Sequence, residues 1–224
     1  MATRFYLPSS GTAPASPAIS AEWEHVQTTR RPTKTTKSST AMANQAYSPD
    51  AADDHTDKDS HFFQFVSDPL TAQTIIGQTV KIQVQGSESN AGNNCSLTWK
   101  LFVCSNDGTT IKETLVAIRR DGLELTTSIV NRGDSGTVIL AVLEEGDRLV
   151  LELGIGGLAT AAGGVNGHNG TLRMGDDQAS DLAENDTETG STFNGWFEFA
   201  ENLTFQSSQS VVPVVMSQYR RRRD

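Results

Sequence analysis

The glycine-rich run GIGGLATAAGGVNGHNG at residues 154–170 is the first candidate for chemistry, because glycine-rich loops can cradle phosphate groups. A phosphate-binding P-loop ends in Lys followed by Ser or Thr, and it opens a helix. The run in this chain has neither that ending nor a helical pattern behind it. We therefore interpret residues 154–170 as a loop between strands.

A second candidate is the concentration of carboxylates between residues 176 and 188. Carboxylate oxygens at this density can bind calcium, but their spacing does not match a calcium-binding helix-loop-helix. The sequence leaves open whether this acidic loop binds calcium or is a polar surface loop. Its carboxylates belong to Asp176, Asp177, Asp181, Glu184, Asp186 and Glu188.

The remaining reactive residues form no recognisable reaction centre. The 4 histidines are dispersed without the spacing of a zinc site, and neither a Gly-x-Ser-x-Gly elbow nor a His-Glu-x-x-His helix occurs. A pair of glycosidase carboxylates stays open as an alternative, because the chain holds 27 acidic residues. We expect a protein that is not an enzyme and that has no catalytic residue, no cofactor and no metal.

The two cysteines are predicted to be free thiols. Cys95 and Cys104 flank a strand candidate, and nine residues at ~3.3 Å each hold them ~30 Å apart. A disulfide needs Cα atoms within ~7 Å. An intermolecular bridge is the alternative, and free thiols agree with synthesis in a reducing cytoplasm.

The elements that would position these residues are short strands. From residue 61 onward, apolar and polar residues alternate over short runs that are separated by Gly, Asn and Asp, which is typical of an antiparallel sandwich. The run 97–104 is apolar on both faces, so we expect it to lie centrally or against another subunit. The expected strands are 80–84, 97–104, 111–119, 123–130, 137–143, 148–155, 171–174 and 196–199.

Four short segments between these strands read as turns. Residues 106–108 (Asn-Asp-Gly) predict a hairpin, and residues 120–122 (Arg-Asp-Gly) predict a second turn. Residues 144–147 predict a tight hairpin between the strands on either side. The segment 131–136 contains an Arg-Gly-Asp tripeptide, which we interpret as part of a turn and not as an integrin motif.

Together these patterns predict an all-β fold, an antiparallel β-sandwich of the jelly-roll type with about eight to ten strands and a long extended N-terminal arm. A jelly roll is favoured over an immunoglobulin-like sandwich because two long loops interrupt the strands. A doubly wound α/β fold is not expected, since no segment has a long helical period.

The first sixty residues differ from the rest in composition. They are rich in Ala, Ser, Thr and Pro, and their few large apolar residues are scattered without helical or strand period. Such a segment cannot build its own core, so we expect it to fold against something else. The predicted organisation is an extended arm at 1–60, a sandwich domain at 61–219 and a basic tail at 220–224.

The charge distribution limits the partners. The chain carries a formal net charge of -9, and residues 61–219 hold 8 basic and 19 acidic residues. An acidic body argues against binding nucleic acid, because phosphate contacts need clustered Lys and Arg. No apolar run is long enough to span a bilayer, and no signal peptide is recognised. We expect neither a nucleic acid nor a membrane as a partner.

The opening residues resemble the start of uncharacterised proteins of tailed bacteriophages, including cyanobacterial ones. The resemblance begins with Arg-Phe-Tyr-Leu-Pro-Ser-Ser-Gly at residues 4–11 and includes Pro14, Pro17 and Trp23. It covers most of the chain, and none of its motifs is catalytic. Further similar segments are residues 67–70, 87–90, 103–108, 146–148, 170–175 and 196–199.

This resemblance implies a structural protein of the virion, made in the host cytoplasm. The layout is similar to that of capsid cement or decoration proteins, in which a sandwich head carries an arm that staples neighbouring subunits. The implied partners are the major capsid protein or other virion subunits, and further copies of the chain itself, with a trimer as one option. The expected interface residues are Phe5, Tyr6, Leu7, Trp23, Arg30, Arg31, Arg220, Arg221, Arg222 and Arg223.

Two other functions remain open from the sequence. The first is a tail, neck or fibre component with the same layout. The second is a carbohydrate-binding or receptor-binding module, in which Trp196 and the loops at 154–170 and 190–196 contact sugars. Core packing is the alternative role for Trp196.

Overall fold

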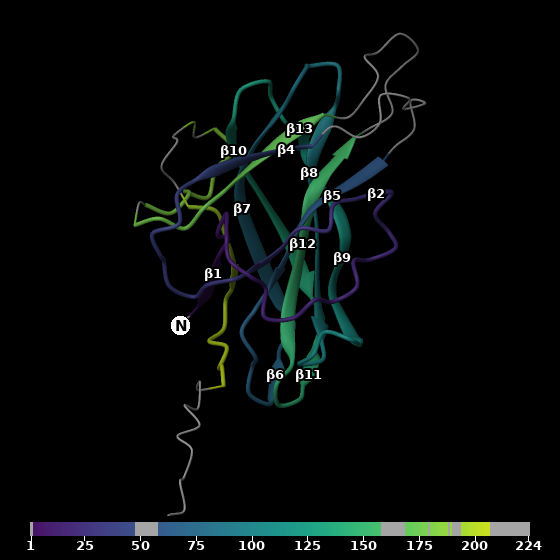
Figure 1. Cartoon of the computed structure of the whole chain (residues 1–224), viewed down its shortest axis with the longest axis vertical. Helices are drawn as coiled ribbons and strands as arrows, with labels where there is room; N and C mark the ends of the chain where they lie inside the picture. Colours follow the sequence, from purple (N-terminus) through teal and green to yellow (C-terminus); the bar gives the residue numbers. More distant parts are fainter. Residues whose placement is uncertain are drawn as a thin grey trace, which may run out of the picture.

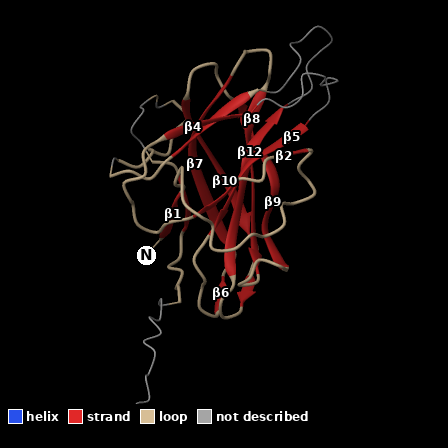
Figure 2. Ribbon diagram, in the orientation of Figure 1, coloured by secondary structure: helices blue, strands red, loops and turns tan. Residues whose placement is uncertain are grey.

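The computed structural model describes residues 2–47, 58–157, 169–178, 180–187, 189 and 194–206. Over these residues the chain forms strands and loops and no helix (Figure 2). None of the described segments is therefore a helix that could cross a membrane. The all-β fold predicted from the sequence is confirmed.

One sheet is built around two long central strands, β8 and β12, which are antiparallel and buried along their whole length. β5 pairs with the other side of β12, and β9 pairs with the other side of β8. Two short strands, β2 and β3, add to β5 in parallel. The bounds are β2 His25–Val26, β3 Arg30–Pro32, β5 Lys58–Val66, β8 Cys95–Cys104, β9 Ile111–Glu124 and β12 Arg148–Gly157.

The second sheet is centred on β7. β10 pairs with one side of β7, while β14 and β13 share its other side, one after the other. β1 extends the sheet beyond β14, and β4 extends it beyond β13. The bounds are β1 Thr3–Tyr6, β4 Ala43–Tyr47, β7 Gln78–Glu88, β10 Val130–Val138, β13 Gly170–Met174 and β14 Trp196–Phe199.

The two sheets enclose one apolar core, as a sandwich requires. Val80, Ile82 and Val84 of β7 point into it, and Trp99 and Leu101 of β8 meet them from the other sheet. The chain passes between the sheets repeatedly along its length, which is the connectivity expected of a jelly roll. A separate two-stranded sheet, β6 (Gln73–Ile75) with β11 (Ala141–Leu143), closes the lower end of the molecule in Figure 1.

The N-terminal segment, residues 2–47, is extended, as expected, but it lies on the sandwich of its own chain. Phe5 and Leu7 are fully buried in the core, and the Phe5 ring stacks on Phe197 with centroids 4.5 Å apart. The expected boundary between arm and sandwich was residue 60, whereas residues of the N-terminal segment are part of the core and β5 already begins at Lys58. The physical reason is that the edge strands β14, β13 and β5 offer backbone partners to which the segment adds short strands.

A buried carboxylate fastens this segment to the outer face of β12. Glu152 is fully buried, and both its side-chain oxygens accept hydrogen bonds from the segment. Oε1 accepts the Ser20 backbone N–H at 2.9 Å, and Oε2 accepts the Trp23 indole N–H at 2.8 Å. Gln64 of β5, directly opposite Glu152, also donates to Oε1, at 3.2 Å. We call this arrangement the Glu152 latch.

Residues beside Glu152 extend the latch. Gln64 accepts a hydrogen bond from Arg30, whose guanidinium also donates to the Pro17 carbonyl. On the other side of Glu152, Lys100 of β8 forms an ion pair with Glu22. A row of polar residues across three strands thus holds the segment between residues 17 and 30.

The segment also covers the second apolar face of β8. Phe102 and Cys104 point away from the core and pack with Val66 and Val150, and Ala13 and Ala15 lie over this cluster. The sequence predicted that this strand lies centrally or against another subunit. The strands that pair with β8 and the residues that cover its second face all belong to the same chain. The cysteines at the two ends of β8 are buried free thiols, as expected.

The predicted turns are confirmed in part. Residues 106–108 join β8 to β9 in a hairpin. Residues 120–122 are not a turn, because β9 continues through them and takes up the extra length as a bulge opposite β8. Residues 144–147 form a turn but not a hairpin, since β11 and β12, the strands on either side, belong to different sheets.

The tripeptide Arg132-Gly133-Asp134 is part of strand β10 and not of a turn. At Gly133 a Cβ atom would lie 2.1 Å from the Gln83 side-chain nitrogen on β7, so a larger residue here would displace the end of the Gln83 side chain. In the same way, Gly154 lies in β12 and not in a loop, and a Cβ atom there would meet the Ser60 carbonyl oxygen at 1.9 Å. Glycines that resemble turn signals therefore mark close contacts between strands.

Asp134, in the middle of β10, links the two sheets through Trp99 of β8 and Arg119 of β9. Its carboxylate accepts the Trp99 indole N–H at 2.7 Å and two hydrogen bonds from Arg119 at 2.8 and 3.0 Å. Asp121 of β9 lies nearby, and its Oδ2 is buried without a hydrogen-bond partner among the described residues. Burial, helped by the charge of Asp134, raises the pKa of Asp121 to about 6.

We expect the Glu152→Gln substitution to lower the free energy of unfolding by about 2–3 kcal/mol, because the Trp23 indole N–H and the Ser20 N–H lose a charged acceptor in a buried site. Chemical denaturation measures the change, and limited proteolysis should show earlier cleavage within residues 2–47. The control is Glu113→Gln on the exposed face of β9, which should change stability by less than about 0.5 kcal/mol. Equal stability of both variants would contradict the latch.

The Asp121→Asn substitution should raise thermal stability at pH 7 but not at pH 4. The pKa of Asp121 in the folded chain lies above the ordinary value of 3.8, so the folded state holds its proton more tightly than the unfolded state. This contribution to stability is complete below about pH 4 and is lost as the pH rises through about 6. Melting temperatures of both proteins from pH 4 to 7 test this, and parallel curves would refute it.

Candidate assembly surface

The structure separates the expected interface residues into three groups. Phe5, Tyr6, Leu7 and Trp23 are buried in their own chain, at most 8% exposed, so they are not exposed anchors in this structure. Arg30 belongs to the Glu152 latch, and Arg31 donates to the Ser9 carbonyl at 3.2 Å. The four arginines Arg220, Arg221, Arg222 and Arg223 lie outside the described residues.

Trp196, the candidate for sugar stacking, is closed off by its neighbours. Its side chain is 1% exposed, and its indole N–H donates to the Leu182 carbonyl at 2.9 Å. The Arg4 guanidinium lies 3.9 Å from the ring centroid and forms ion pairs with Asp181 and Glu198. Trp196 therefore has the core-packing role that was its alternative, and it offers no platform for a sugar.

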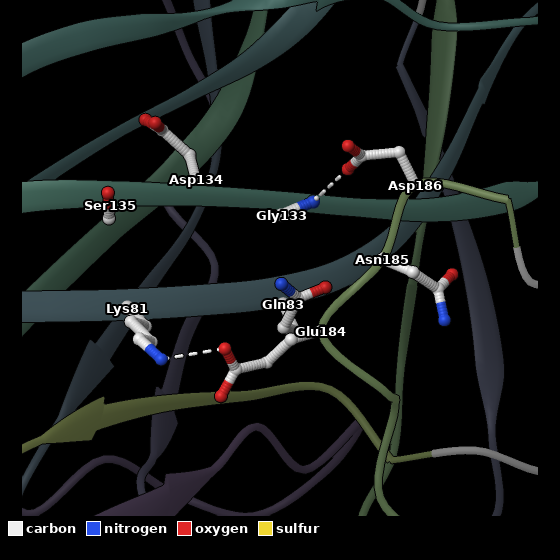
Figure 3. A pocket seen from close by; sticks show the side chains of 8 residues that line it. All are labelled: Lys81, Gln83, Gly133, Asp134, Ser135, Glu184, Asn185 and Asp186. Carbon is white, nitrogen blue, oxygen red and sulfur yellow. Dashed lines mark hydrogen bonds and ion pairs between the residues drawn. The ribbon is translucent and has the colours of Figure 1, made fainter.

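A polar depression of about 370 Å³ lies on the outer face of β7 and β10 (Figure 3). Lys81 and Gln83 of β7, Gly133 and Ser135 of β10, and the loop at residues 184–186 form its walls. The loop is held in place by an ion pair from Glu184 to Lys81 at 2.7 Å and by a hydrogen bond from the Gly133 N–H to Asp186 at 2.9 Å.

The three carboxylates at this depression are engaged in structural contacts. Asp134 binds Trp99 and Arg119, Glu184 binds Lys81, and Asp186 binds the β10 backbone. A pair of carboxylates in acid and base catalysis must instead face a substrate from both sides. The depression thus has the chemistry of a polar surface hollow that anchors a loop.

The acidic loop has similar internal partners where it is described. Asp176 accepts a hydrogen bond from Ser38 at 2.7 Å, and Asp181 pairs with Arg4 and Lys37. Glu188 lies outside the described residues. Within the described residues, no group of three or more His, Cys, Asp or Glu side chains is arranged to hold a metal ion.

Among the described residues, the most exposed large apolar side chains lie at the end of the sandwich formed by β6 and β11. Four large apolar side chains project there: Ile76 is 56% exposed, Ile139 is 51%, Leu140 is 62% and Val142 is 74%. We call these four residues the apolar tip. Contiguous exposed apolar residues on a soluble protein mark interaction sites, whereas single ones need no explanation.

The strand pairing explains why these side chains face outward. In the register of β11 and β6, Ala141 lies opposite Ile75 and Leu143 lies opposite Gln73. The apolar side chains among these residues are buried in the core. Because side chains alternate along a strand, Leu140 and Val142 must point to the other side. The alternation therefore places large apolar groups in solvent at this end of the molecule.

The apolar tip was not predicted from the sequence, although a signal was present. Residues 138–143 form an unbroken apolar run, Val-Ile-Leu-Ala-Val-Leu. A strand at the end of a sandwich buries only one face, so a run that is apolar on both faces leaves one face for something else. The run at 97–104 has the same pattern, but there the N-terminal segment supplies the cover.

Known proteins resemble this chain in their solved structures and not in their sequences. No protein family matches the sequence, and no curated protein is similar to it. A CocE/NonD family hydrolase from Staphylococcus aureus has 10% identity and a TM-score of 0.49 over 92% of this chain and 36% of the hydrolase chain. This chain therefore spans about a third of the length of that hydrolase.

Two further solved structures are more distant. The C-terminal domain of EclA, a sugar-binding protein, has 12% identity and a TM-score of 0.25 over 58% of this chain and 74% of that domain. VP2 of infectious bursal disease virus, in a subviral particle, has 16% identity and a TM-score of 0.22 over 86% of this chain and 44% of VP2. The TM-scores of all three structures lie below 0.5 and carry no assignment of function.

Proposed function

We propose that this protein is a non-enzymatic structural subunit of a phage virion, a capsid cement or decoration protein that docks on the shell through its apolar tip. The apolar tip is the observation that carries the proposal. Its four large side chains are between 51% and 74% exposed, whereas the chain covers the second apolar face of β8 with its own N-terminal segment. The resemblance of residues 4–11 to phage proteins supports the class of particle.

The chemistry of the tip favours a protein partner. Interface centres are apolar and desolvated, and a polar rim surrounds them. Glu144 and Glu145 follow Leu143 directly and border the apolar tip, where Glu144 forms an ion pair with Lys112. A shell surface with an apolar pocket and basic residues around it would complement this arrangement. Further copies of the chain, a trimer among the options, stay a prediction.

The N-terminal segment has a different role in this proposal from the one expected for a staple. Its large apolar residues fill the core, and its polar contacts form the Glu152 latch. It therefore stabilises the head that presents the tip. The contact with neighbouring subunits is assigned to the tip.

The double substitution Leu140→Ser and Val142→Ser should weaken binding to shells assembled from the major capsid protein by about a hundredfold. The loss of one apolar anchor at an interface centre costs on the order of 1–2 kcal/mol, and 1.4 kcal/mol corresponds to tenfold in affinity. Both side chains are exposed, so the sandwich should unfold at nearly the same temperature. Co-sedimentation of the variant with shells over a concentration series measures the affinity.

Leu123→Ser is the matched control, because Leu123 is 48% exposed and lies at the C-terminal end of β9, outside the apolar tip. It should bind shells like the unchanged protein. Equal affinity of the double variant and the control would overturn the proposal.

A further inference from the structure

The described chain ends beside the apolar tip. Phe205 forms a β-bridge with Leu70. Thr204 accepts a hydrogen bond from the Thr71 N–H and donates its own N–H to the side chain of Gln73, the first residue of β6. Gln206, the last described residue, donates its backbone N–H to Pro69 at 2.9 Å and its side chain to Glu145 at 2.6 Å. The C-terminal 18 residues, 207–224, therefore continue from the same end of the sandwich that carries the tip.

The sequence beyond Gln206 has three parts in order. Residues 207–210 are Ser-Ser-Gln-Ser, residues 211–216 are Val-Val-Pro-Val-Val-Met, and Arg220, Arg221, Arg222 and Arg223 follow. The run 211–216 is the one apolar stretch in these 18 residues. Five residue steps from Gln206 reach about 16 Å, whereas β6 spans about 10 Å, so Val211 can reach the tip.

We propose that the C-terminal run at residues 211–216 covers the apolar tip of its own chain in the free subunit, and that the shell displaces it on docking. The proposal rests on the proposed function, because it concerns the same surface before assembly. The run offers four valines and a methionine to Ile76, Ile139, Leu140 and Val142. Burial of apolar area on both sides drives this contact.

Two physical arguments favour the chain's own segment over other occupants. A short tether gives the run an effective concentration in the millimolar range, so even a weak contact is well populated. Arginines follow the run in the sequence, and the border of the tip contains Glu145, so attraction between opposite charges would favour this docking direction. Pro213 lacks a backbone donor, which favours side-chain packing over a long added strand.

The test uses the full chain with a spin label. Ser217→Cys places the label directly after the run, and burial raises the pKa of Cys95 to about 12 and that of Cys104 to about 11, so the new thiol is the reactive one. Paramagnetic broadening of methyl signals reports proximity. We expect broadening at three residues of the tip, Ile76, Leu140 and Val142. We expect none at Leu123, an exposed leucine at the C-terminal end of β9.

A second labelled protein carries Val211→Ser, Val212→Ser, Val214→Ser and Val215→Ser, and in it the broadening should be lost. Mixing labelled chains with isotope-enriched unlabelled chains separates contacts within a chain from contacts between chains. No broadening at the tip, or broadening in the mixed sample alone, overturns the proposal. The second result would identify another copy as the occupant.

Shell binding by the unlabelled four-serine variant keeps the two proposals apart. A tip that is covered for about four-fifths of the time binds with a fivefold lower apparent affinity, so the variant should bind shells about fivefold more tightly. If broadening is seen but the affinity for shells is unchanged by the substitutions in the run and in the tip, the cover stands and the proposed function fails. If the tip substitutions abolish shell binding but no broadening is seen, the proposed function stands and the cover fails.

Discussion

A charged carboxylate can be buried in a protein only if hydrogen-bond donors surround it, and Glu152 meets this requirement through the N-terminal segment. Without residues 17–30, the row formed by Gln64, Glu152 and Lys100 would lie on an open sheet face, and the apolar cluster of Phe102 and Val150 would lie beside it. The segment satisfies the polar row and covers the apolar cluster together. The sandwich and its N-terminal segment are therefore one folded unit.

The chain covers one of its apolar faces and leaves another exposed. The second face of β8 carries Phe102 and Cys104, and it is covered by Ala13 and Ala15. The β6 and β11 end carries Leu140 and Val142, which are 62% and 74% exposed. The chain thus covers one apolar face with its own residues and exposes apolar side chains at another. That contrast within one molecule supports an assembly role.

Much of the fold could be predicted because alternation and turn residues act locally. The strands 80–84, 97–104 and 148–155 correspond to β7, β8 and β12 within a few residues. The errors arose where tertiary packing decides. Gly133 and Gly154 resemble turn signals, yet they allow close contacts between strands. Phe5 and Trp23 looked like anchors for another protein, because sequence cannot show that Phe197 and Glu152 are their partners.

The candidate site was less predictable than the fold. The aromatic and arginine residues chosen for an interface are mostly those that docking of the N-terminal segment uses, while Ile76, Ile139, Leu140 and Val142 were not chosen. Exposure of an apolar residue depends on which sheet its strand joins. The run 138–143 crosses from β10 to β11, and only the pairing of β11 with β6 turns Val142 outward.

Electron microscopy of the virion in which this protein is proposed to assemble tests the proposed function most directly. We predict copies of the sandwich spread over the shell, with the β6 and β11 end against the major capsid protein. Copies confined to the neck or tail, or copies on the shell with this end facing solvent, would contradict it.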